Sequence, residues 1–75
     1  MNNYEEVYLL KIQEICGNKL ILSKEDICNV FNISLSTLNR RLKIKTGIPK
    51  FDKISGSITF RLHEVVKFLL SEAKL

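Results

Sequence analysis

Side chains that donate hydrogen bonds gather in residues 36–61, and they suit a polyanionic partner. Arginine and lysine donate to phosphate oxygens and to guanine, asparagine pairs with adenine, and hydroxyls at a helix start bind phosphate. The candidate binding residues are Ser36, Thr37, Asn39, Arg40, Arg41, Lys43, Lys45, Lys50, Lys53 and Arg61. The chemistry this set offers is contact with a phosphate backbone and with base edges.

The net charge of +4 is concentrated in the same part of the chain. Residues 1–34 carry three basic and five acidic side chains, whereas residues 35–53 carry six basic side chains and Asp52 alone. Concentrated positive charge is the footprint expected for a nucleic-acid partner. The alternative interpretation is a solvated basic surface that keeps the protein soluble.

The sequence lacks the residues that catalysis or metal binding would require. The sequence has no glycine-rich phosphate loop and no nucleophile motif, and its adjacent acidic pair Glu25 and Asp26 falls at a predicted helix start. His63 is interpreted as an exposed residue at another helix start. Cys16, Cys28 and His63 do not complete a four-ligand zinc site, and the cysteines are predicted to be reduced core residues. We therefore predict no enzyme activity, no cofactor and no metal.

The N-terminus predicts a cytoplasmic protein. It is acidic, and its short apolar run is broken by Lys11. No run approaches the ~18 apolar residues of a membrane span, and a signal peptide is not expected.

Two short helices are predicted to position the candidate residues, as a helix-turn-helix over residues 23–46. Ser23 begins a capping-box-like sequence, followed by the apolar face Ile27, Val30 and Phe31. Asn32 tolerates the left-handed backbone that the turn requires. Ser34 caps a second helix over residues 34–45, whose inward positions are Leu35, Leu38 and Leu42.

The other predicted elements surround this pair. An extra N-terminal helix lies within residues 1–18, with its buried face at Tyr4, Val7, Tyr8, Ile12 and Ile15, and a short extended run covers residues 20–22. Strands over residues 50–54 and 57–61 form a hairpin with Ser55-Gly56 as its turn, so that Phe51 pairs with Phe60, and Lys50, Thr59 and Arg61 share the other face. A last helix covers residues 63–73.

This order predicts one domain over residues 1–75, mainly α-helical with a small β-hairpin. It is the order of a winged helix-turn-helix with residues 50–61 as the wing. In such a fold Thr37, Asn39, Arg40 and Arg41 read bases, and the remaining basic residues contact the backbone. For Asn39, an incidental surface position is an equal alternative.

Several motifs resemble the excisionase and AlpA-like group of small MerR-type winged-helix proteins. They are Leu22-Ser23-Lys24-Glu25-Asp26-Ile27, Phe31-Asn32-Ile33-Ser34, Thr37-Leu38-Asn39-Arg40, Gly47-Ile48-Pro49-Lys50, and Phe60-Arg61-Leu62 followed by Val65-Val66. The resemblance implies sequence-specific DNA binding, either to direct an integrase toward excision or to regulate transcription in a phage or mobile element. It assigns Thr37 and Arg40 to the recognition helix, and Lys50 and Arg61 to the wing. Asn32 departs from the usual turn glycine.

A second function class stays open, a protein-interaction module that docks an integrase, a replication protein or a host protein. Phe68 lies off the main apolar stripe of the last helix, and an exposed Phe68 would indicate such a contact surface. The N-terminal helix either completes the core or forms a surface for self-association or a partner.

Overall fold

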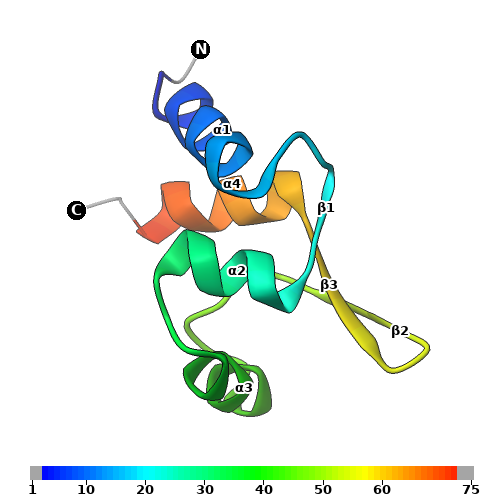
Figure 1. Ribbon diagram of the computed structural model, residues 1–75. Coiled ribbons are helices and arrows are strands. Elements are labelled where there is room, and N and C mark those ends of the chain that lie inside the picture. Colours follow the sequence, from blue (N-terminus) through cyan, green and yellow to red (C-terminus); the bar gives the residue numbers. More distant parts are fainter. Residues whose placement is uncertain (1–2, 73–75) are drawn as a thin grey trace.

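The computed structural model describes residues 3–72, which form four helices and a three-stranded antiparallel sheet (Figure 1). The elements are α1 (Asn3–Cys16), β1 (Ile21–Leu22), α2 (Lys24–Phe31), α3 (Leu35–Ile44), β2 (Asp52–Ile54), β3 (Ser57–Arg61) and α4 (Leu62–Glu72). The predicted mainly helical fold with a small hairpin is confirmed. Ala73, the last residue of the predicted final helix, lies outside the described residues.

The sheet has the order β1-β3-β2. The hairpin turn is Ser55-Gly56, as predicted, with φ of 51° and 82°, and positive φ at both central residues matches the twist of a tight hairpin. Phe51 precedes β2, and its ring lies 6.0 Å from that of Phe60, which confirms the predicted pair. The pairing of β1 with β3 was not predicted, because a two-residue strand is too short to show a sequence period.

The core lies where α1, α2, α4 and the sheet meet. Its buried hydrophobic side chains come from every one of these elements and from α3: Ile12, Leu22, Ile27, Leu38, Phe60, Leu62, Val65 and Val66. In Figure 1, α1 and α3 lie at opposite ends of the molecule, with α2 and α4 between them and the hairpin projecting to one side. One small core therefore joins two outer helices of very different composition.

The buried face of α1 differs from the predicted one. Ile12 is buried and Tyr8 is partly buried, as expected, but Tyr4 is 70% exposed, and Val7 and Ile15 are also exposed. Leu9 and Cys16 pack on the core instead. Apolar residues occur almost all round this helix, so its periodicity did not specify a face. Packing against α2 and α4 decides which side is covered.

Two further predictions about apolar residues are wrong. Leu35 is 50% exposed, because α3 packs mainly on α2 and its narrow contact strip covers only Leu38 and part of Leu42. Phe68 is not an exposed contact residue: it is half-buried, and its ring stacks on that of Phe31 with centroids 5.7 Å apart. This stack joins α4 to the end of α2.

Candidate nucleic-acid interface

The turn between α2 and α3 has the backbone that its sequence predicts. Asn32 adopts the left-handed conformation with φ 56° and ψ 50°, and the N–H of Ile33 donates to the carbonyl of Cys28 at 3.0 Å. Ser34 then caps α3 by accepting from the N–H of Thr37 at 3.2 Å. Two helices are thus joined by three residues whose backbone and side chains fix the direction of the second helix.

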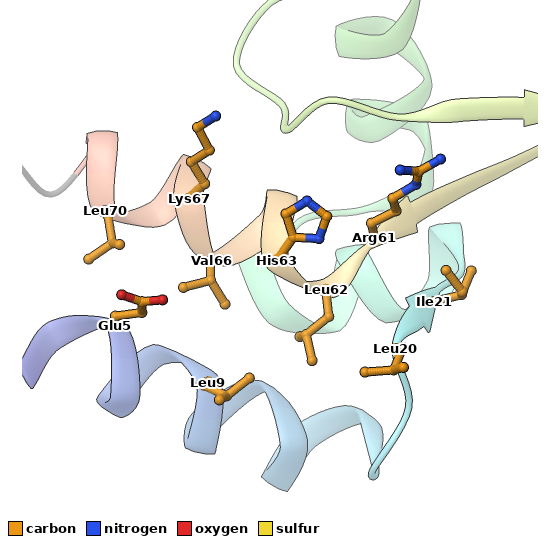
Figure 2. Close-up of a pocket in the computed structure, with 10 residues that line it drawn as sticks. All are labelled: Glu5, Leu9, Leu20, Ile21, Arg61, Leu62, His63, Val66, Lys67 and Leu70. Atoms are coloured by element: carbon orange, nitrogen blue, oxygen red, sulfur yellow. The ribbon is translucent and has the colours of Figure 1, made fainter. Parts of the chain in front are cut away.

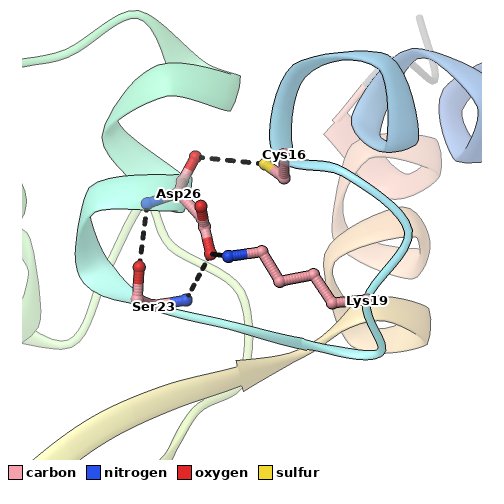
Figure 3. Close-up of polar contacts among 4 residues, drawn as sticks. All are labelled: Cys16, Lys19, Ser23 and Asp26. Carbon is pink, nitrogen blue, oxygen red and sulfur yellow. Dashed lines mark hydrogen bonds and ion pairs between the residues drawn. The ribbon is translucent and has the colours of Figure 1, made fainter.

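The start of α2 is held by a cluster of polar contacts around Asp26 (Figure 3). The carboxylate of Asp26 accepts from the N–H of Ser23 at 2.9 Å, and Ser23 Oγ accepts from the N–H of Asp26 at 3.2 Å, which completes a capping box. Lys19 Nζ lies 2.8 Å from Asp26 Oδ2, and the Cys16 thiol donates to the Asp26 carbonyl at 3.8 Å. The end of α1, the following loop and α2 are therefore joined at one residue.

The electrostatics of this cluster favour a charged Asp26. Burial acts to raise the pKa of Asp26, but hydrogen bonds from Lys19 and Ser23 and the lysine charge outweigh it, so the pKa lies below its ordinary value. Burial, together with the nearby Asp26 charge, raises the pKa of the Cys16 thiol. Cys16 and Cys28 are free thiols, as predicted. Cys16 is thus a neutral structural residue at neutral pH.

One face of α3 carries four of the candidate binding residues. Ser36, Asn39, Arg40 and Lys43 follow the spacing i, i+3, i+4 and i+7, which aligns them along one side of a helix, and all four are exposed. The buried Leu38 lies on the opposite side. The structure therefore brings four of the predicted residues together on one polar strip.

Thr37 and Arg41 lie beside this strip and are engaged in local contacts. Thr37 Oγ1 accepts from the Ser34 hydroxyl at 3.0 Å, and Thr37 is half-buried. Arg41 is also half-buried, and its Nη1 donates to the carbonyl of Gly47 at 3.3 Å. Gly47 has φ 71°, and a Cβ there would lie 3.5 Å from Arg41 Cδ. Arg41 thus supports the loop after α3 rather than extending outward with Arg40.

Lys24 is a residue of this face that the sequence did not identify. Its Nζ donates to Oδ1 of Asn39 at 2.9 Å. This bond joins the first residue of α2 to the middle of α3. A lysine at a helix start is electrostatically unfavourable, because the helix dipole is positive there. The unfavourable position of this positive charge is the sequence signal that could have pointed to another role for Lys24.

The basic residues of the hairpin do not form one surface. Antiparallel register puts Lys53 opposite Ile58, on the same hairpin face as Phe51 and Phe60, whereas Thr59 and Arg61 lie on the other face. Arg61 Nε donates to Asp52 Oδ2 at 3.1 Å, and both residues border a depression with Lys50 and Glu64. Lys50 and Arg61 are therefore neighbours, as predicted, but two carboxylates accompany them.

The charge asymmetry of the sequence is also an asymmetry in space. α1 carries Glu5, Glu6 and Glu14 against Lys11, whereas α3 and the chain up to Lys50 carry basic side chains and no acidic one. Lys45 is exposed and ends α3 in the left-handed conformation. Because α1 and α3 lie at opposite ends of the molecule (Figure 1), the positive charge is on the α3 side.

A groove lies away from α3, between α1, α4 and β1 (Figure 2). Its volume is about 560 Å³. Figure 2 shows Leu9, Leu62 and Val66 pointing into the space between the two helices. The basic side chains that border it are Arg61, His63 and Lys67, and Glu5 is at the α1 side. His63 is largely exposed at the start of α4, where its Nε2 lies 3.4 Å from Oε2 of Glu64.

Membrane spans and metal sites were sought within residues 3–72. No helix in this part of the chain has the length and apolar character that a membrane span requires. Among the same residues, no three histidine, cysteine, aspartate or glutamate side chains are grouped to hold a metal ion.

Comparison of the chain with known protein families, with curated proteins and with solved structures found no match.

Proposed function

We propose that the protein binds double-stranded DNA sequence-specifically through a winged helix-turn-helix, with α3 in the major groove and the hairpin as the wing. The observation that carries the proposal is the strip of Ser36, Asn39, Arg40 and Lys43, exposed along one side of a helix whose opposite side is buried. A recognition helix needs this arrangement, because a few adjacent side chains must reach base edges together.

The electrostatics support the same function. Lys43 and Lys45, with Lys50 farther along the chain, are exposed and suited to phosphate oxygens, which give affinity without sequence preference. Lys53 and Arg61 lie on opposite faces of the hairpin. Only one of these two faces would therefore lie against a DNA strand in the complex. The acidic helix α1 would then face away from the DNA.

The biological role we propose is that of a small excisionase-like directionality factor or a transcriptional regulator of a phage or mobile element, acting in the cytoplasm. The motif resemblance, which covers about residues 20–70, supports this role, and the protein would act without catalysis or a cofactor. An integrase or a second copy of the chain is the proposed protein partner. A footprint separates the two roles: tandem sites beside an attachment site indicate excision, and a single site over a promoter indicates regulation.

Selection from a random duplex library tests the DNA-binding proposal. The folded protein is expected to enrich a defined sequence, and Arg40→Ala is expected to weaken that enrichment without unfolding the chain. Enrichment of no sequence by a protein that stays folded would contradict specific recognition.

A protein-interaction module is the second candidate, and the groove between α1 and α4 favours it. Its floor is apolar, and Leu20 beside it is 75% exposed. Apolar pockets with a few polar side chains at the rim are common recognition sites. Two results together would favour this function. The folded protein would bind no duplex DNA at low salt, and Leu20→Ser would leave the stability of the fold unchanged, as expected for a residue exposed for a partner.

A further inference from the structure

We propose that Lys24 sets the hydrogen-bonding character of Asn39, so that α3 selects guanine over adenine at the base pair that Asn39 faces. This inference rests on the proposed DNA-binding function and names the base that this part of the surface prefers. It reverses the simplest expectation for asparagine, which pairs with adenine through one acceptor and one donor.

The argument begins with the contact between the two side chains. Lys24 Nζ lies 2.9 Å from Asn39 Oδ1. A lysine ammonium has three donors and no acceptor, so only the amide oxygen of Asn39 can face it, and this fixes the orientation of the amide. The Asn39 oxygen is engaged by a charge-assisted bond, and its NH₂ group is left with its two donors.

The bases then differ in what they offer to such a surface. Guanine presents two acceptors, N7 and O6, in the major groove, and adenine presents the acceptor N7 and the donor N6–H₂. Against adenine, the N6–H₂ donor would have to use the second lone pair of an oxygen that already accepts from Lys24, and it would lie beside the positive charge of that ammonium. Against guanine, both acceptors find donors.

The neighbouring charged side chains strengthen this preference. Arg40 follows Asn39 on the exposed strip, Lys43 is one turn farther, and both side chains are donors only. Lys24 is half-buried, although it occupies the unfavourable first position of α2. Its removal should therefore not weaken α2, and the position is open to substitution.

The experiment is selection from a random duplex library with the wild type and three variants. Asn39→Ala identifies the base position that Asn39 reads, because the preference there is lost. At that position the wild type is expected to enrich guanine over adenine on the order of tenfold. Lys24→Met frees the Asn39 oxygen and is expected to shift the preference toward adenine. Lys43→Met removes the same charge from the exposed strip, and it should weaken binding without changing the preference.

Several results would overturn the inference. They are enrichment of adenine by the wild type, an Asn39→Ala variant that alters no position, and the same base preference in Lys24→Met as in Lys43→Met. A wild type that enriches no sequence overturns the proposed function itself, which is a distinct outcome.

If a thermal melt shows that Lys24→Met is not folded, Asn39→Asp provides a second test of the inference. It retains the partner of Lys24 but replaces the amide donors with an acceptor, so the guanine preference should disappear in favour of cytosine. Retention of the guanine preference by this variant would also overturn the inference.

Discussion

The ammonium nitrogen of Lys19 lies 2.8 Å from Oδ2 of Asp26, and this ion pair joins the loop after α1 to the first turn of α2. The same carboxylate accepts from the N–H of Ser23 as part of the capping box. One side chain therefore caps α2 and anchors it to the preceding loop. Because α3 packs mainly on α2, the direction of the candidate interface depends on this contact.

Loss of the Asp26 carboxylate should destabilise the fold. We expect Asp26→Ala to lower the free energy of unfolding by about 1–2 kcal/mol, since it removes the capping box and leaves the Ser23 amide without its acceptor. Urea denaturation measures this change. Glu25→Ala is the matched control, because it removes an exposed acidic residue from the same helical turn. Equal losses in the two variants would mean that the capping contacts contribute nothing specific.

Asp26 should also make stability depend on pH. Its pKa in the folded chain lies below its ordinary value of 3.8, so the unfolded chain binds the proton more readily. The stabilisation is then complete above the unfolded pKa and is lost as the pH falls through the folded pKa. We expect the free energy of unfolding to fall progressively below about pH 5, and to fall less in Asp26→Asn. Parallel pH profiles for the two proteins would contradict this.

The turn residue Asn32 should respond to substitution through its backbone. Asn32 has φ 56°, and alanine cannot make the local hydrogen bonds by which asparagine tolerates this left-handed conformation. We expect Asn32→Ala to lower the free energy of unfolding by about 1–2 kcal/mol. Asn32→Gly removes the Cβ and should leave stability nearly unchanged or raise it slightly. Denaturant midpoints distinguish the two variants. A glycine variant as unstable as the alanine variant would show that the left-handed conformation is not what limits this position.

The adjacent arginines of α3 should have separable effects. Arg40 is exposed on the polar strip, whereas Arg41 donates to the Gly47 carbonyl. We expect Arg40→Ala to weaken duplex binding about tenfold with an unchanged melting temperature, and Arg41→Ala to lower the melting temperature. Fluorescence anisotropy on a DNA duplex and thermal melting provide the two readouts. Equal loss of DNA affinity in both variants, without loss of stability, would contradict the assignment.

Local sequence signals predicted the helix caps and the turn better than they predicted the packing. Ser23, Asn32 and Ser34 act through their own backbone neighbourhood, and each has the predicted cap or turn geometry. The exposed Leu35 and Tyr4 and the stacked Phe68 were missed because burial depends on which elements meet. A single apolar period cannot supply that information for a helix with apolar residues on several sides.

Long-range polar contacts were missed for the same reason. Lys24 and Asn39 are fifteen residues apart, and Lys19 reaches Asp26 across the start of α2. Nothing in the local spacing of these residues specifies a partner. The sequence therefore identified Asn39 as a candidate, but the structure was needed to determine which of its atoms is available.

The salt dependence of duplex binding tests the proposed interface most directly. With the wild type, the logarithm of the affinity should fall linearly with the logarithm of salt concentration, with a slope of about −0.9 for each phosphate contact. Removal of one phosphate-contacting charge in Lys43→Met should make that slope shallower by about one. A folded wild-type protein that is not retained on duplex DNA even at low salt would contradict the proposal.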